Sequence, residues 1–252
     1  MHRLLDIVSS ATASTLRSWR GTSANKTIQQ PKEHIILFDR EGCSECRFVR
    51  EALTELNFDV MIAPCPKGGR NIRKLKRESG TDKLPRLVDP NTEKNLTGRK
   101  AIIDYLYSTY RGVPAPKQLN DNLFNNLSSV IASAVRLNAG STSRATRPAE
   151  LPLTLYSFES SPFSRPVREL LCELELPYQL INLGKQQLSD MGPAKPRFTL
   201  KPYQPIANSK RADFFKQHGN VQVPYLVDPN TGTEMFESKD ILNYLRKQYC
   251  VE

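Results

Sequence analysis

An internal duplication is the strongest constraint on how this chain folds. Residues 87–92 and 226–231 share the identical sequence LVDPNT at an offset of 139 residues, and residues 43–51 align with residues 161–169 at an offset of 118. The second copy therefore carries an insertion of about 21 residues, which we place within residues 184–220. Two collinear matches indicate that one structural unit occurs twice.

A fainter third match extends each unit toward its amino end. Residues 9–17 align with residues 128–136 at an offset of 119, and Gly21 then meets Gly140. The match predicts that a short amphipathic helix and a polar linker precede each compact domain. We divide the chain into a helix and linker (1–30), unit one (31–112), a linker with the repeated helix (113–150) and unit two (151–252).

The first 30 residues also have the composition of a targeting segment. They are rich in Ser, Thr and Arg and contain one acid, Asp6, which is typical of organellar transit peptides. A cleaved peptide would have no reason to recur inside the chain, so we expect a helix packed on its own domain. One helical face can collect the larger apolar residues Leu5, Val8, Leu16 and Trp19. A transit peptide and a membrane-surface helix are the alternatives. We expect a cytoplasmic protein, or one of an organellar stroma or matrix if the segment is a leader.

Both units show the same alternation of elements. In unit one, hydrophobic periodicity and turn residues predict the order β-α-β-α-β-β-α. The strands are expected at 34–38, 59–63, 86–88 and near 94–96, and the helices at 44–56, roughly 70–79 and 99–110. In unit two the main elements are expected at 153–158, 165–175, 178–183, 225–227 and 238–248. Strand–helix alternation implies parallel pairing early, and the tight hairpin implies antiparallel pairing late.

A family resemblance follows from these features. Cys43 and Cys46 form a C-x-x-C directly after the first strand, and Leu84-Pro85 opens the third strand. Together with the element order, these features resemble the thioredoxin fold, and more closely glutaredoxins and the amino-terminal domains of glutathione transferases. The resemblance implies an α/β chain of two tandem thioredoxin-like domains. We find no counterpart of the all-helical domain that follows in ordinary glutathione transferases.

The C-x-x-C is the candidate catalytic centre. A cysteine at the amino end of a helix has a lowered pKa, because unpaired backbone N–H groups stabilise its thiolate. We expect Cys43 to be the nucleophile, helped by Arg40 and Arg47 and opposed by Glu45, with moderate activation. Cys46, one turn later, is placed to attack a mixed disulfide on Cys43 as the resolving thiol.

Other roles for these thiols stay open. The C-x-x-C is also compatible with half of a zinc site, an iron–sulfur cluster bridged between chains, or an inert pair. A structural zinc site usually needs four Cys or His ligands, whereas the nearest third ligand is Cys65 and the three histidines form no cluster. We expect no metal, and we expect Cys65 to be a packed free thiol.

The resemblance also implies a substrate-binding edge in unit one. Pro85 matches the cis-proline of the family, so the backbone of Leu84 is implied to pair with glutathione or a substrate peptide. Unit one departs from the family pattern at Gly98-Arg99, where an acid that binds the ligand ammonium is missing. Arg99 is expected to hold a glutathione carboxylate by charge, and a disulfide-containing protein is an alternative substrate.

Unit two has hydroxyls where unit one has thiols. Its segment from Ser161 to Arg168 resembles the serine-type glutathione transferases, in which the first serine donates a hydrogen bond to the glutathione thiolate. Val223-Pro224 matches the cis-proline dipeptide, and Glu237-Ser238 matches the pair that binds the γ-glutamyl end. These residues are expected to bind glutathione, with Ser238 at a helix start holding a carboxylate. A plain helix cap at Ser238 is the simpler alternative.

Composition limits the remaining function classes. The formal net charge is +10, but the basic residues are spread out and no nucleic-acid motif appears, so we expect no nucleic-acid partner and instead attraction of anionic glutathione. No apolar stretch approaches the ~18–20 residues of a membrane span, so we expect no stable membrane insertion. The insertion is expected to be a solvated irregular loop, with a lid over unit two or a partner surface as the alternative.

Three functions are compatible with the sequence. The first is a glutathione-linked thiol–disulfide oxidoreductase with Cys43 and Cys46 as its centre and unit two as a glutathione-binding domain. The second is a transferase that uses Ser161. The third is a protein without enzymatic activity that binds glutathione or senses redox state.

Overall fold

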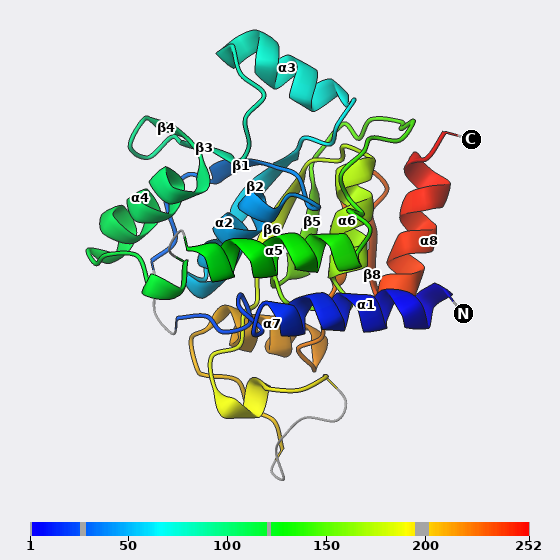
Figure 1. The fold of residues 1–252 in the computed structure, drawn as a ribbon. Helices are drawn as coiled ribbons and strands as arrows, with labels where there is room; N and C mark the ends of the chain where they lie inside the picture. Colours follow the sequence, from blue (N-terminus) through cyan, green and yellow to red (C-terminus); the bar gives the residue numbers. More distant parts are fainter. Residues whose placement is uncertain (1, 26–28, 120–121, 195–201, 252) are drawn as a thin grey trace.

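One eight-stranded mixed sheet organises the chain in the computed structural model, which describes residues 2–25, 29–119, 122–194 and 202–251 (Figure 1). The strand order is β4-β3-β1-β2-β6-β5-β7-β8. The left half of this order comes from unit one and the right half from unit two. The two units therefore share one sheet.

The elements of unit one occur in the predicted order. They are β1 (Ile35–Asp39), α2 (Ser44–Glu55), β2 (Val60–Pro64), α3 (Arg70–Ser79), β3 (Arg86–Asp89), β4 (Lys94–Thr97) and α4 (Arg99–Arg111). Helix α1 (His2–Leu16) precedes them. Strand β1 pairs in parallel with β2 and antiparallel with β3, and β3 forms the expected hairpin with β4.

Unit two repeats this arrangement. After η1 (Lys117–Leu119) and α5 (Leu123–Val135) come β5 (Leu153–Ser157), α6 (Arg165–Glu173), β6 (Tyr178–Asn182), η2 (Leu188–Asp190), α7 (Lys210–His218), β7 (Tyr225–Asp228), β8 (Thr233–Phe236) and α8 (Ser238–Tyr249). The pairings of β5 with β6 and β7, and of β7 with β8, match those of unit one. The α/β fold of two thioredoxin-like units is thus confirmed.

The predicted insertion is more regular than expected. We expected a solvated irregular loop over 184–220, but the described part contains η2 and α7, and α7 is the counterpart of α3. Phe214 on α7 is buried against Tyr225 of β7, which explains why this segment orders as a helix on the sheet. Residues 195–201, which include Lys195, Arg197 and Lys201, lie outside the described residues.

The units join through their β2 and β6 strands. These strands pair antiparallel, with Met61 opposite Gln179 at the centre of the register. The main hydrophobic core runs across the junction, since buried Ile62 of β2 and Leu180 of β6 belong to the same cluster. A shared sheet and a shared core make the two repeats one body.

The helices that precede the units are exchanged between them. Helix α1 packs on α5 and on α6 of unit two, whereas α5 packs on α2 of unit one. The linkers follow the same crossing, because Ser23 pairs with Lys185 of unit two and Thr142 pairs with Lys67 of unit one. In Figure 1, α1 and α5 lie side by side in front of the sheet. The expectation that the first helix packs on its own domain is therefore wrong.

The buried face of α1 also differs from the predicted one. Leu5, Val8 and Leu16 are exposed, whereas Ser10, Ala13 and Ser14 are buried. On α5, small residues are buried in the same way, at Ser129, Ala132 and Ser133. Small side chains let two helices approach closely, and here they override the larger apolar residues that periodicity picks out.

Two equivalent glycines allow the linkers to cross the junction. Gly21 and Gly140 both adopt positive φ angles, +69° and +75°. A Cβ on Gly21 would lie 2.7 Å from Cβ of Glu159, and one on Gly140 would lie 2.8 Å from Cβ of Glu41. Glycine is needed at both positions for its conformation and for its lack of a side chain.

The structure also bears on all-helical domains and on membrane-spanning helices. In the part of the chain that the structure describes, no all-helical domain follows either unit. None of the helices of that same part is long and apolar enough to span a bilayer.

Candidate functional site

Cys43 occupies the N-cap position of α2, as predicted. Its backbone is extended (φ −82°, ψ 125°), its side chain is partly exposed, and its backbone N–H donates to the carbonyl of Arg40 at 2.9 Å. Strand β1 ends at Asp39 and the helix begins at Ser44, so the short turn between them presents the thiol at the helix amino end.

This position activates the Cys43 thiol. A hydrogen bond from the Cys46 thiol makes the largest contribution, and with the backbone N–H groups of Cys46 and Glu45 and the charge of Arg50 it lowers the pKa of Cys43 to about 5. These contributions outweigh burial, which acts in the opposite direction. The lowered pKa favours the thiolate form of Cys43 near neutral pH.

Cys46 has the opposite character. It is fully buried one turn into α2, and burial together with its hydrogen bond to Cys43 raises its pKa well above the usual value. Both cysteines are free thiols. A reactive outer thiolate with a protonated inner thiol beside it is the arrangement that stepwise disulfide exchange requires.

The cations expected to assist Cys43 are engaged elsewhere. Arg40 donates to the carbonyl of Cys65, and Arg47 donates to the carbonyl of Ser129 on α5. Glu45, expected to oppose the thiolate, forms an ion pair with Arg99 at 3.1 Å. The cation that acts on Cys43 is Arg50, one turn further along the buried face of α2. Sequence reasoning missed Arg50, although its repeat partner Arg168 was a signal.

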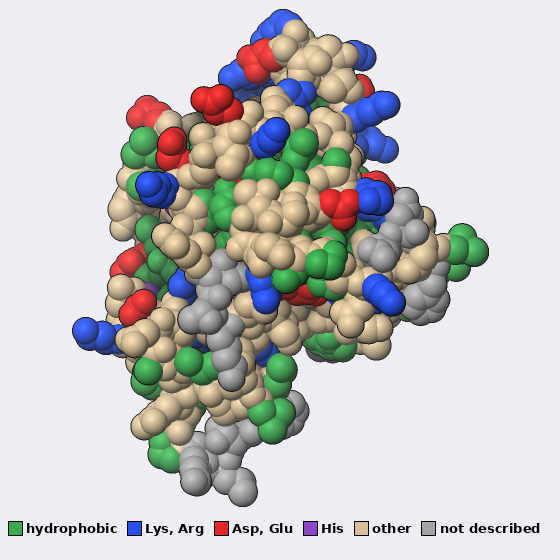
Figure 2. Space-filling model, turned by 90° about the vertical axis from the view of Figure 1, so that its left-hand side faces the viewer, with side chains coloured by type: hydrophobic (Ala, Val, Ile, Leu, Met, Phe, Trp, Pro, Cys, Tyr) green, Lys and Arg blue, Asp and Glu red, His purple; other side chains and the backbone are tan. Residues whose placement is uncertain are grey.

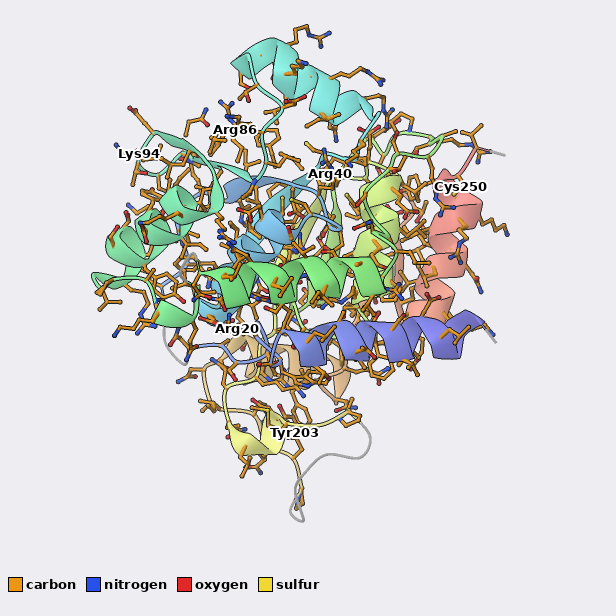
Figure 3. The ribbon with its side chains drawn as sticks, viewed as in Figure 1. Arg20, Arg40, Arg86, Lys94, Tyr203 and Cys250 are labelled. Atoms are coloured by element: carbon orange, nitrogen blue, oxygen red, sulfur yellow. The ribbon has the colours of Figure 1, made fainter. Side chains whose placement is uncertain are left out.

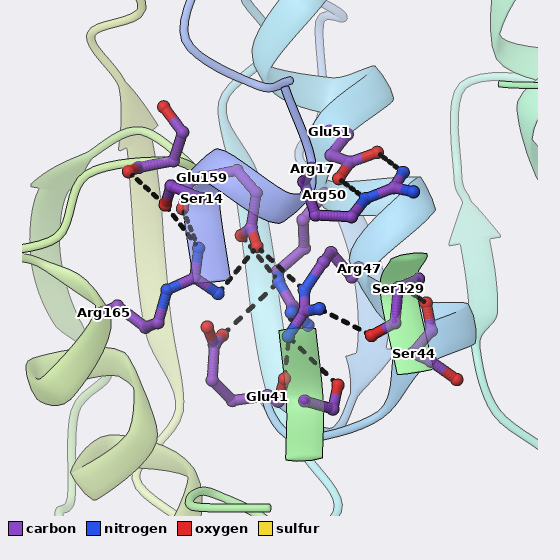
Figure 4. A network of polar contacts seen from close by, with 12 residues as sticks. Ser14, Arg17, Glu41, Ser44, Arg47, Arg50, Glu51, Ser129, Glu159 and Arg165 are labelled. Carbon is purple, nitrogen blue, oxygen red and sulfur yellow. Dashed lines mark hydrogen bonds and ion pairs between the residues drawn. The ribbon is translucent and has the colours of Figure 1, made fainter. Parts of the chain in front are cut away.

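Arg50 belongs to a buried charge network at the junction of the units (Figure 4). It donates to Asp39 of β1 at 2.7 Å and to Glu159 of unit two at 2.9 Å. Its repeat partner Arg168 donates to Glu41 of unit one at 2.9 Å and lies 3.1 Å from Glu159. All of these side chains are at most 3% exposed.

Burial and the charges of the network shift the pKa values of its acids. Burial would raise the pKa of Glu159, but the surrounding arginines hold it well below its ordinary value. In Asp39, burial wins over the charge of Arg50 and raises the pKa to about 6. Glu159 is therefore the fixed anion on which the cations of both units converge.

Leu84 and Pro85 lie directly before β3, the strand that pairs with β1. The Leu84–Pro85 peptide bond is cis, as the resemblance implied, and so is Val223–Pro224 in unit two. Gly98, at the start of α4, donates its N–H to the carbonyl of Pro85 at 2.9 Å. The edge of unit one is thus tied to the helix that carries Arg99.

Arg99 is less available than predicted. Its side chain is 6% exposed, its guanidinium stacks 4.3 Å from the ring centroid of Phe48, and it donates to Asn126 at 2.6 Å. An open hollow of about 520 Å³ surrounds the start of α4 and includes Arg99 and the exposed Lys100. These contacts give Arg99 a structural part in holding α4 and α5 together.

Ser161 aligns with Cys43 in the repeat, but α6 begins only at Arg165 with Ser164 as its N-cap, so Ser161 lies one turn before the helix. Its hydroxyl accepts hydrogen bonds from the N–H and the hydroxyl of Ser164, at 3.2 and 3.0 Å. A hydroxyl has two acceptor sites and one donor. Ser161 is 1% exposed, and both acceptor sites of its hydroxyl are used by Ser164.

A cavity of about 390 Å³ opens beside Ser161. Trp19 from the exchanged amino-terminal segment forms part of its wall, together with Phe163 and Val223 of unit two and Met191 and Pro193 of the insertion. This volume lies within the range of small-molecule sites. Tyr203, labelled in Figure 3, donates to Asp190 at 2.6 Å and fixes the turn that carries Met191.

The remaining predicted residues of unit two lie at the open end of the β7–β8 hairpin, opposite its turn. The register pairs Tyr225 with Phe236, so Pro224 and Glu237 are neighbours where the hairpin ends. Glu237 has a positive φ of 66° and precedes Ser238, the first residue of α8. Its carboxylate accepts from the amide of Gln222 at 2.7 Å, which ties the α8 start to the segment that carries Val223.

The structure also describes the third cysteine of unit one, Cys65, and the candidate metal ligands. Cys65 is buried, and burial raises its pKa to about 12, as expected for a packed free thiol. Among the residues described here, no group of three or more His, Cys, Asp or Glu side chains is arranged to hold a metal ion.

Comparison with known proteins identifies the repeated unit. The family model described as glutathione S-transferase, N-terminal domain, matches the chain in two segments, residues 37–114 and 155–250. The segments cover more than half of the chain and coincide with the two thioredoxin-like units. Searches of the curated proteins and of the solved structures give no match.

Proposed function

Because the chain belongs to the family of the glutathione S-transferase N-terminal domain, we propose that it is a glutathione-linked thiol–disulfide oxidoreductase. The observation that carries this proposal is the paired state of the two thiols. Cys43 has a pKa of about 5 at the start of α2, and Cys46 beside it keeps its proton. Nothing comparable exists in unit two, where both positions are serines.

The proposed reaction has three steps. The Cys43 thiolate attacks the substrate disulfide, one substrate sulfur becomes bonded to Cys43, and the other leaves as a thiolate that takes a proton from water. Cys46 then loses its proton and attacks Cys43, which releases the second substrate thiol and forms the Cys43–Cys46 disulfide. Two glutathione molecules reduce this disulfide and become glutathione disulfide, so two electrons pass from glutathione to substrate.

In this proposal unit two binds glutathione. Ser161 donates its hydroxyl proton to the glutathione sulfur, and the backbone at Val223 and Pro224 borders the peptide part of the ligand. Glu237 pairs with the ligand ammonium, and Ser238 with the α8 amino end holds a carboxylate. The strained φ of Glu237 supports a role in binding, because such strain persists mainly at functional sites.

The roles in unit one are divided differently. The backbone of Leu84, beside Pro85, pairs with the substrate that carries the disulfide. Arg99 contributes positive charge at the edge of the site, although its contacts to Phe48 and Glu45 limit its reach. The physiological oxidised substrate is then a disulfide-containing protein.

The test is reduction of bis(2-hydroxyethyl) disulfide by glutathione, coupled to glutathione reductase. Wild type should be active, Cys43→Ser should be inactive, and Cys46→Ser should keep activity only toward mixed disulfides with glutathione. Cys250→Ser is the matched control, since this free thiol lies at the end of α8 in the other unit. An inactive wild type, or equal rates for wild type and Cys43→Ser, would refute the proposal.

The cavity at Ser161 favours a second candidate, a transferase. Its mainly apolar wall suits an apolar electrophile beside the glutathione sulfur. In this reaction the sulfur bonds to an aryl carbon and halide leaves. Conjugation of 1-chloro-2,4-dinitrobenzene that is lost in Ser161→Ala but kept in Cys43→Ser would support this function over the first.

A further inference from the structure

Helix α3 is the most basic surface element of unit one. It projects from the sheet at the top of Figure 1, and Lys and Arg side chains gather at the same end of the molecule in Figure 2. Its ten residues include one acid, Glu78, and five exposed cations, which are Arg70, Arg73, Lys74, Lys76 and Arg77. This helix alone supplies +4 of the formal net charge of +10.

Among the cations of α3, Arg70 is the one that pairs with a buried acid in the described part of the chain, at 3.5 Å from Glu175. Ile72 and Leu75 are its buried residues and anchor it through a small apolar cluster. Lys74 and Lys76 are 65% and 66% exposed, and their ion pairs with Glu78 and Asp82 are long, at 3.9 and 3.8 Å. Pairs of this kind contribute little to stability.

The equivalent helix of unit two provides a comparison. On α7, Lys210 pairs with Asp59 at 2.5 Å and Arg211 is buried against Asp190. The early cations of α7 are thus used inside the fold, whereas on α3 Arg70 pairs with Glu175 but stays 48% exposed and the later cations face solvent. In the described part of unit two, α7 has one exposed cation, Lys216, and α8 has three, against five on α3.

Helix α3 is also connected to the thiol site, through Cys65 and Arg40. Its apolar cluster includes Leu84, the residue that precedes Pro85 at the substrate edge. The same cluster contains Cys65, whose carbonyl accepts from Arg40, and the carbonyl of Arg40 accepts from the N–H of Cys43. Figure 3 places Arg40 and Arg86 on the side of the molecule from which α3 projects. A polypeptide seated at Leu84 would reach the α3 cations.

We propose that the disulfide substrate of unit one is an acidic polypeptide, which docks on the exposed basic residues of α3 while its disulfide reaches Cys43. This inference rests on the proposed function and adds the substrate class. Clustered charge of one sign raises the association rate with an opposite partner by about 10–10³-fold at low salt. A nucleic acid fits less well, since α3 has no aromatic residue for base stacking.

Two peptides test the proposal, one rich in glutamate and one rich in lysine, each with one cysteine glutathionylated. We expect wild type to reduce the glutamate-rich peptide with at least tenfold higher kcat/KM, and this preference to shrink at high salt. The double variant Lys74→Glu, Arg77→Glu should lose the preference. The matched control is Arg246→Glu, Lys247→Glu, which makes the same charge change on exposed positions in the last turn of α8 and should keep it.

A binding measurement keeps this inference separate from the proposed function. The same peptides with serine in place of cysteine are titrated by fluorescence anisotropy, which needs no turnover. At least tenfold tighter binding of the acidic peptide, lost in the α3 variant and kept in the α8 variant, supports the proposal. Equal binding of both peptides, equal losses in both variants, or binding only of a DNA duplex overturns it. An enzyme inactive on every disulfide refutes the function and leaves the binding result to decide the docking surface.

Discussion

Arg50 of unit one and Glu159 of unit two form a fully buried ion pair across the junction, with Nε of Arg50 2.9 Å from Oε2 of Glu159. Glu159 lies two residues before Ser161, and Arg50 is the cation that acts on the Cys43 thiolate. The pair therefore connects the candidate sites of both units through one salt bridge.

Removing the charge of Glu159 should destabilise the whole fold. Glu159→Gln leaves Arg50 and Arg168 with one buried anion fewer, and breaking a buried pair from one side costs about 3–5 kcal/mol. Urea unfolding measures the loss. The control is Arg144→Gln. Arg144 pairs with Glu173 but is itself 59% exposed, so we expect its loss to cost less than about 1 kcal/mol. Equal losses would show that the network does not hold the junction.

The reactivity of Cys43 should follow its own titration. Because the pKa is lowered to about 5, alkylation by iodoacetamide should rise through pH 5 and be constant near neutrality. Cys46→Ala removes the largest stabilising contact, since a methyl group cannot donate a hydrogen bond, and should move the midpoint to higher pH. Mass spectrometry of the Cys43 peptide gives the rates, and a midpoint above pH 8 in wild type would contradict the model of an activated thiol.

The same pKa shift predicts a pH-dependent stability. A pKa lowered from 9.0 to about 5 in the folded state means that the thiolate stabilises the fold fully above pH 9, and this contribution disappears as the pH falls to about 5. The difference in unfolding free energy between reduced wild type and Cys43→Ser should therefore shrink from pH 9 to pH 5. A difference that is constant or grows on acidification would argue against the shift.

The glycines at which the linkers cross the junction should not tolerate replacement by a residue with a side chain. Gly140→Ala must adopt a positive φ, which costs about 1–2 kcal/mol, and its Cβ would lie 2.8 Å from Cβ of Glu41, which adds about 1–3 kcal/mol of overpacking. Gly232→Ala has a similar φ of +67° with nothing within 4 Å of its Cβ, so it isolates the backbone part. Thermal unfolding should rank Gly140→Ala well below Gly232→Ala.

Ligand binding at Ser161 should be visible by fluorescence, because Trp19 is the single tryptophan of the chain and borders the cavity. S-hexylglutathione should change the emission of Trp19 and bind at least tenfold more weakly to Ser161→Ala. Ser108→Ala, on the exposed side of α4, should bind as wild type does. A ligand-independent emission would mean that the cavity does not bind this class of ligand.

The amino-acid sequence by itself determined the repeated unit, the order of its elements and the C-x-x-C at the start of α2. These features are local. Strand β1 ends at Asp39 and helix α2 begins at Ser44, so the short turn between them fixes Cys43 at the amino end of the helix. The motif residues at Leu84, Pro85, Ser161, Val223, Pro224, Glu237 and Ser238 are local in the same sense.

Only the tertiary structure decided how the repeats combine. The pairing of β2 with β6, the packing of α1 on α6 and the ion pair of Arg50 with Glu159 depend on contacts between residues more than a hundred positions apart. Periodicity predicted Leu5 and Val8 as the buried face of α1, but close helix packing buries Ser10 and Ala13 instead. The hydrophobic pattern of a single helix predicts which face is apolar, whereas shape complementarity between two packed helices decides which face is buried.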